Sequence, residues 1–153
     1  MRSGTEIAGR WLAVLRMYTG IFWLIHGIPK WMPGAPFVAR FGETTQKLAA
    51  GSTGAYHSYL VSVVLPNASL FGNLLRAGEV LVGISLLFGL LTRMGALGGM
   101  FLALNYMLAK NAMGSIDTYA SLDAAAFVLS FMHLVLPSGY VWGLDRALRR
   151  RRR

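Results

Sequence analysis

The sequence predicts an all-α integral membrane protein, a four-helix bundle with short amphipathic helices in a long first extracytoplasmic loop. The 153 residues are 55% hydrophobic and only 14% charged, whereas a soluble domain carries about a quarter charged residues. The apolar residues gather in four runs near the length that crosses a bilayer. The basic residues behind the net charge of +9 lie mostly outside these runs.

The first predicted span covers residues 11–28 and ends at Pro29, beside Lys30 and Trp31 at the expected membrane interface. A cleavable signal peptide is the competing interpretation. Arg16 interrupts the apolar run, however, and no small-residue cleavage pattern follows. We therefore expect a retained helix.

The second and third predicted spans form a hairpin. Pro66 suits the start of a helix, so the second span is expected over residues 68–91. Thr92–Arg93 then provides a very short turn before the third span, at residues 94–108. A turn this short makes the two helices antiparallel neighbours.

The fourth predicted span covers residues 122–136 and ends or kinks at Pro137. Residues 140–148 are expected to add a second helical piece with Trp142 at the interface. Residues 137–153 form a basic tail, and the whole chain, 1–153, is expected to be one membrane domain.

Basic residues predict the orientation, because cytoplasmic loops are enriched in Lys and Arg. Four spans place both termini on one side. That side collects most of the basic residues: Arg2, Arg10, Arg93, Arg146 and Arg149–Arg153. The other side holds fewer: Lys30, Arg40, Lys47 and Lys110. We therefore expect cytoplasmic N and C termini.

The loop of residues 29–67 is then extracytoplasmic and contains two amphipathic segments. Residues 37–50 carry apolar side chains at helical spacing, and residues 56–65 are apolar on one face but too short to span. A turn-rich joint, Gly51–Gly54, separates them. We expect them to lie on the outer membrane face or to form a lid over the bundle.

The terminal arginines, Arg149–Arg153, admit two interpretations. Next to a membrane span, such a run is a topology signal and a contact for anionic lipid. No aromatic interleaving or nucleic-acid-binding motif accompanies it, so we expect no nucleic-acid partner.

Polar residues inside the predicted spans are the candidate binding site, because ionisable groups at bilayer depth are costly and usually functional. They are Arg16, His26, Arg76, Glu79, Asn105 and His133. At a rise of about 1.5 Å per residue they form one polar layer in the middle and outer half of the bundle.

Two interpretations of this layer remain open. In the first it is an ion-pair network that fixes helix packing, with Glu79 paired to Arg76 three residues away or to Arg16 on a neighbouring helix. In the second it is a pocket for a small amphipathic ligand such as a quinone headgroup, which needs a few convergent donors in an apolar cleft.

The histidines raise a haem hypothesis. His26 and His133 lie at similar predicted depth on different spans, which is the minimum for two axial ligands of a b-type haem. Packing and hydrogen bonding explain two isolated histidines more often, so the sequence favours a structural role over haem.

Composition and motifs exclude several other sites. There is no cysteine, so iron–sulfur ligation by this chain and Cys-bound zinc are excluded. No nucleophile–base set, phosphate loop, Rossmann fingerprint or zinc signature occurs, so we predict no catalytic residue and no metal site. The G-x-x-x-G of Gly95 and Gly99 predicts close helix contacts, and a face for another subunit is a further use of it.

Two segments resemble the DoxX/DoxD family. Residues 16–32, RMYTGIFWLIHGIPKWM, are similar to the family's opening R–x–x–x–G and G–x–x–K pattern. Residues 66–99 resemble its G-E and L–x–x–G–L–x–T-R signature, with matching positions at Glu79, Gly83, Gly89, Thr92 and Arg93. The resemblance implies a four-helix bundle in a bacterial or archaeal cytoplasmic membrane.

The resemblance also implies a redox setting. DoxD-like proteins include the small membrane subunit of thiosulfate:quinone oxidoreductase, and other members associate with membrane redox assemblies. Carried onto this sequence, the functional polar centre is Arg16, Arg76 and Glu79, with His26 and Lys30 near its outer rim.

Two function hypotheses follow. The first is a subunit of a quinone-linked electron-transfer complex that contributes a polar pocket, with quinone as the possible cofactor. The alternative is a non-catalytic accessory subunit at the periphery of a larger respiratory or photosynthetic membrane complex. Both imply the lipid bilayer and other membrane subunits as partners, and neither gives this chain a self-contained catalytic site.

Overall fold

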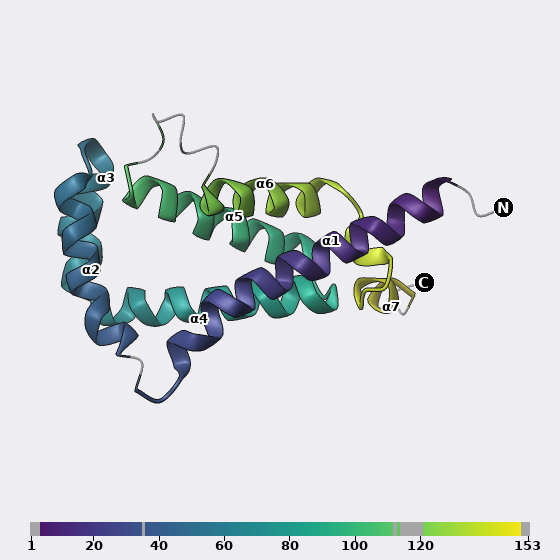
Figure 1. The fold of residues 1–153 in the computed structure, drawn as a ribbon, viewed down its shortest axis with the longest axis horizontal. Helices are drawn as coiled ribbons and strands as arrows, with labels where there is room; N and C mark the ends of the chain where they lie inside the picture. Colours follow the sequence, from purple (N-terminus) through teal and green to yellow (C-terminus); the bar gives the residue numbers. More distant parts are fainter. Residues whose placement is uncertain (1–3, 35, 112, 114–120, 151–153) are drawn as a thin grey trace.

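The computed structural model describes residues 4–34, 36–111, 113 and 121–150 (Figure 1). All regular structure in these residues is helical, which confirms the predicted all-α class. The longer helices are α1 (Gly4–Gly27), α2 (Phe37–Gly51), α4 (Ala68–Phe88), α5 (Thr92–Ala109) and α6 (Leu122–Val135). The shorter ones are α3 (Gly54–Tyr59) and α7 (Asp145–Arg150).

Helices α1, α4, α5 and α6 run lengthwise (Figure 1) and contribute the main core. Helix α1 packs on α4 and α6, and α5 packs on α4 and α6. Each contributes buried side chains to one cluster: Trp23, Val82, Leu86, Ala96, Leu102, Ala103 and Ala126. Both termini lie at one end of this assembly, and α2 and α3 cover the other end (Figure 1).

The outward faces of these helices are apolar. Trp11, Leu81 and Phe101 are each more than 60% exposed, and each belongs to a different long helix. Soluble proteins rarely expose apolar surface on this scale, so these faces suit lipid contact. Gly4–Trp31 and Gly54–Phe88 are long and apolar enough to cross a membrane, and α6 is a shorter apolar helix.

The turn between α4 and α5 lies earlier than predicted. Thr92 and Arg93 already belong to α5, and the turn is made by residues 89–91. Gly89 ends α4 in the left-handed region with φ 62°, which glycine adopts without steric cost. Leu91 follows with φ 50°, and the Ser85 hydroxyl donates to the Leu90 carbonyl at 2.7 Å.

The amphipathic loop segments form a cap across one end of the long helices (Figure 1). The predicted helix at 37–50 is α2, and the predicted joint lies at Ser52–Thr53, between α2 and α3. Helix α3 continues through a π-helical turn, Leu60–Val64, and a 3₁₀ turn that contains Pro66. Pro66 lacks a backbone N–H, which accounts for a break in the helix here.

The C-terminal segment packs under the opposite end and is therefore not a free tail. The Leu144 and Asp145 amides donate to the Phe88 and Gly89 carbonyls at 3.1 and 2.8 Å. The Asp145 carboxylate accepts from the Leu91 and Thr92 amides at 2.7 and 3.0 Å, so it caps the start of α5.

The predicted glycine face on α5 is used inside the molecule. A Cβ at Gly95 would meet the Ser85 side chain, and one at Gly99 would lie 2.6 Å from the Ser130 hydroxyl. Both glycines are buried. This face therefore joins α5 to α4 and α6 and is not free to receive another subunit.

Candidate functional site

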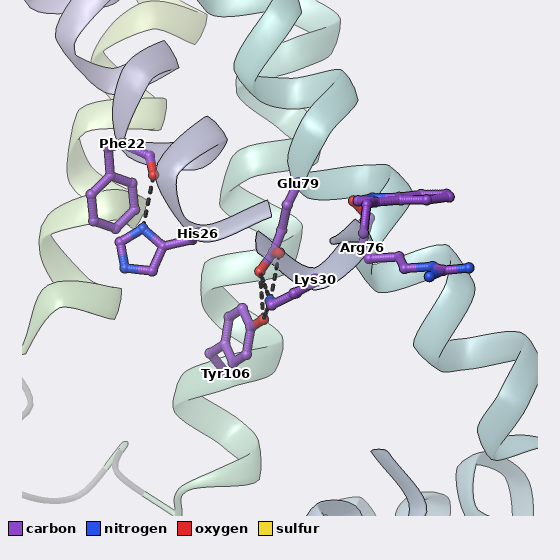
Figure 2. Close-up of polar contacts among 7 residues, drawn as sticks. Phe22, His26, Lys30, Arg76, Glu79 and Tyr106 are labelled. Atoms are coloured by element: carbon purple, nitrogen blue, oxygen red, sulfur yellow. Dashed lines mark hydrogen bonds and ion pairs between the residues drawn. The ribbon is translucent and has the colours of Figure 1, made fainter. Parts of the chain in front are cut away.

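A charged cluster with a buried carboxylate is formed by Lys30, Glu79 and Tyr106 (Figure 2). The Lys30 ammonium donates to both Glu79 carboxylate oxygens at 2.6 and 2.5 Å. The Tyr106 hydroxyl donates to Glu79 Oε1 at 2.6 Å and accepts from Lys30 Nζ at 3.0 Å. The Glu79 side chain is 1% exposed and that of Lys30 18%.

Three chain segments bring this cluster together. Glu79 comes from α4 and Tyr106 from α5, while Lys30 lies in the 3₁₀ turn that follows α1. Pro29 ends α1, and Gly27 permits the close approach, because a Cβ there would lie 3.0 Å from the Glu79 Cβ. The Lys30 ammonium also lies over the Phe37 ring, 4.8 Å from its centroid.

We expect Tyr106→Phe to destabilise the protein by about 2 kcal/mol, because a hydrogen bond to a charged group is lost in a buried site. Thermal unfolding in detergent, followed by circular dichroism, measures the change. Tyr18→Phe is the control, since Tyr18 is 61% exposed. An equal loss in both variants would contradict a special role for the Tyr106 hydroxyl.

Arg76 does not pair with Glu79, contrary to the first interpretation of the polar layer. Its guanidinium lies over the Trp31 ring, 3.9 Å from the centroid, and donates to Asn73 Oδ1. Figure 2 shows the Arg76 side chain leading away from the Lys30–Glu79 pair. Three-residue spacing allowed the predicted pair. Lys30, from the turn after α1, donates to both Glu79 oxygens instead.

An apolar cavity of about 310 Å³ lies beside the cluster, between the cap and the bundle. The polar groups that line it include Tyr56, Asn105 and Tyr106. The Tyr56 hydroxyl donates to Asn105 Oδ1 at 3.2 Å, and Asn105 Nδ2 donates to the Phe101 carbonyl at 2.8 Å. Its apolar walls include Phe41, Leu60, Val64, Phe71, Leu75 and Leu102.

His26 and His133 lie in different surroundings. His26 is exposed, and its Nδ1 lies 2.8 Å from the Phe22 carbonyl on its own helix (Figure 2). His133 is fully buried, and its Nε2 lies 3.1 Å from the Thr19 hydroxyl. The Thr19 hydroxyl donates to the Leu15 carbonyl at 2.8 Å, so the His133 ring donates through Nε2.

Arg16 lies at the opposite end from Glu79. It is fully buried, and its Nη2 donates to the Trp142 and Val141 carbonyls at 3.0 and 3.5 Å. A Cβ at Gly89 or Gly143 would crowd its guanidinium. Arg16 therefore holds the C-terminal segment in place, and it is not the partner of Glu79.

The predicted single polar layer is thus two clusters. Arg16 and His133 lie toward the termini, whereas Arg76, Glu79 and Asn105 lie near the cap. Sequence reasoning missed Tyr106 and Tyr56, because tyrosines are common at membrane interfaces and give no separate signal. Lys30, expected at the outer rim of the polar centre, lies inside the cluster, and its position in the turn directly after α1 lets its side chain reach Glu79.

Apolar outward faces, two stretches long enough to cross a bilayer and a buried ion pair define a helical membrane protein. The sequence matches the DoxX family over residues 11–111, more than half of the chain, so the chain belongs to this family. The match covers most of α1, all of α2 to α5 and the whole Lys30–Glu79–Tyr106 cluster. Comparison with curated proteins and with solved structures gives no match.

Proposed function

We propose that this DoxX-family protein is a membrane subunit of a quinone-linked redox complex and that a quinone headgroup binds in the cavity beside Tyr106. The observation that carries the proposal is the arrangement of this cavity. Its walls are mostly apolar, its few polar groups converge from different elements, and the only described carboxylate bonded to Tyr106 is that of Glu79. Ligand pockets typically combine these features.

The residues fit a quinone. Apolar side chains on two sides suit a flat ring and an isoprenoid tail. Asn105 uses one Nδ2 hydrogen on the Phe101 carbonyl, which leaves the second for a ligand carbonyl. The Tyr56 hydroxyl retains free acceptor capacity. The volume of about 310 Å³ lies at the lower end of the range for ligand pockets, about 300–1,000 Å³.

When bound, a quinone supplies a two-electron carrier whose reduction takes up two protons. This chain provides binding and orientation through Asn105 and Tyr56. Tyr106 connects the cavity to the buried ion pair, because its ring lines the cavity and its hydroxyl donates to Glu79. Lys30 donates to both oxygens of the same carboxylate, so the Tyr106 hydroxyl binds a Glu79 side chain that is already held in place. Of the six sequence candidates, Asn105 and Glu79 remain in this proposal.

Photo-crosslinking with an azido-quinone tests the site in the purified full-length protein. We expect labelled peptides from residues 54–64 and 101–109. Asn105→Leu is expected to weaken labelling about ten-fold, since a hydrogen bond worth about 1.4 kcal/mol corresponds to that change in affinity. Asn67→Leu is the control, because Asn67 is exposed and bonds only to its own helix turn. Equal labelling of both variants would contradict this site.

The same purification distinguishes the accessory-subunit alternative. Protein extracted from native membranes in mild detergent is expected to retain co-purifying subunits and extractable quinone. If the Glu79→Gln variant still assembles with these subunits and the complex keeps its turnover, a packing role is favoured. The internal use of Gly95 and Gly99 moves any subunit contact to the outer helix faces.

We further propose four membrane crossings by α1, α4, α5 and α6, in a bacterial or archaeal cytoplasmic membrane. Both termini are then cytoplasmic and the cap is extracytoplasmic. The distribution of basic residues and the position of both termini at one end support this topology (Figure 1). Arg149–Arg153 would contact anionic lipid.

A further inference from the structure

A surface groove lies at the terminal end of the bundle, away from the quinone cavity. It has a volume of about 670 Å³ and is bordered by α1, the end of α4 and the C-terminal segment. Its walls are largely apolar and include Met17, Leu87, Phe88 and Leu144. Trp142 and Arg146 also line it.

Trp142 is held in this groove by an unusual backbone. Its φ of 50° lies in the left-handed region, which bulky residues seldom adopt. The buried Arg16 fixes the Trp142 carbonyl, and the Leu144 amide bonds to the Phe88 carbonyl just beyond. Trp142 nevertheless remains 60% exposed. A buried arginine therefore stabilises a conformation that presents an aromatic ring to the surroundings, which points to a contact outside the chain.

Two arginines accompany this ring. The Arg10 guanidinium lies over the Trp142 ring, 6.0 Å from its centroid. Arg146 is exposed at the groove. Within the described part of the chain neither arginine belongs to an ion pair. The groove therefore has positive charge that no described carboxylate neutralises.

An apolar strip leads away from these charges along α1. Val14, Met17 and Ile21 follow Arg10 at helical spacing and are 43%, 37% and 44% exposed. Phe88, on the facing helix α4, is 53% exposed. Cationic groups and a tryptophan at one end of an apolar strip match the headgroup and acyl chain of a lipid.

We propose that this groove binds an anionic phospholipid of the cytoplasmic leaflet. Arg10 and Arg146 receive the phosphate, the Trp142 ring lies at headgroup level, and an acyl chain lies along Met17 and Phe88. The leaflet assignment rests on the proposed orientation. The site itself is independent of quinone binding, because it lies at the other end of the bundle.

Brominated lipids test this site, because a bromine in an acyl chain quenches a tryptophan that it contacts. The full-length protein is placed in phosphatidylcholine vesicles that contain a minor fraction of dibrominated phosphatidylglycerol or, separately, dibrominated phosphatidylcholine. The difference between the wild-type protein and Trp142→Phe isolates the signal of Trp142. We expect stronger quenching of Trp142 by phosphatidylglycerol than by the same fraction of phosphatidylcholine.

The arginine variants measure the selectivity. Each arginine near a membrane surface contributes about five-fold to the attraction of an anionic lipid. Arg10→Gln with Arg146→Gln is therefore expected to lower the preference for phosphatidylglycerol about 25-fold. Arg93→Gln with Arg149→Gln is the matched control, since it removes the same charge from the same predicted side and Arg93 does not line the groove.

The outcomes separate the alternatives. A preference that survives the control pair and disappears in the groove pair supports the site. Equal quenching by the two lipids in the wild-type protein would overturn it, as would an equal loss in both pairs, which indicates general attraction by the basic end. Protection of Trp142 from both lipids in a co-purified complex would also overturn it, in favour of a protein partner. Loss of quinone labelling leaves each of these readouts unchanged.

Discussion

Lys30→Met is expected to lower the stability of the protein by about 3–5 kcal/mol, because it leaves the Glu79 carboxylate buried without its counter-charge. Glu79 is 1% exposed, so water cannot replace the ammonium without opening the bundle. For a chain of this size the loss corresponds to a decrease in Tm of about 6–20 °C. Thermal unfolding in mild detergent measures it.

Two further variants make this result specific. Adding Glu79→Gln to Lys30→Met removes the buried charge, so part of the lost stability is expected to return. Lys110→Met is the control, because it breaks the ion pair with Asp123, in which the lysine side chain is 52% exposed. Such exposed pairs contribute about 0–1 kcal/mol. If Lys110→Met were as damaging as Lys30→Met, burial would not be the cause.

Gly20→Ala is expected to cost about 3 kcal/mol, the upper end of the usual penalty for overpacking. Gly20 lies where α1 crosses α4, and a Cβ there would meet the Leu87 amide nitrogen and lie 2.8 Å from the Leu87 Cα and 2.9 Å from the Gly83 carbonyl oxygen. These are backbone atoms, so the clash is relieved only by moving the two helices apart.

The matched comparison is Gly51→Ala, at the end of α2. Beyond its chain neighbours and the backbone of its own helix, no atom lies within 4 Å of a Cβ built there, so this substitution is expected to change Tm little. Unfolding of the two variants under the same conditions gives the comparison. A Gly20→Ala protein as stable as the wild type would mean that α1 and α4 are separated further than the structure shows.

The helices were predictable from the sequence because their signals are local. Pro29, Pro66 and Pro137 each lie at the end of an apolar run, and proline restricts the backbone wherever it occurs. The amphipathic spacing of residues 37–50 likewise predicted α2, since the periodicity of a helix is contained within one segment. Helix ends were less exact: α1 begins at Gly4, before the predicted start at residue 11.

The partners of the polar residues were not predictable in the same way. Depth along a helix follows from counting residues, but the direction of a side chain around the bundle depends on how four helices are rotated against one another. Counting therefore placed Arg16 and Glu79 in one layer, although Arg16 bonds to the Trp142 carbonyl and Glu79 to Lys30. Asp145 carried no sequence signal for its role at the start of α5, 53 residues away from Thr92 along the chain.

The hydrogen bonds from the start of α5 to Asp145 form late, because the two partners are far apart in the chain. Leu91 is synthesised 54 residues before Asp145, the residue that accepts its amide hydrogen bond. At a synthesis rate of about 5–20 residues per second, Asp145 is added roughly 3–10 s after the start of α5. The α4–α5 turn therefore has open amides until the chain is nearly finished, and a chain that ends before Asp145 would keep the start of α5 without these hydrogen bonds.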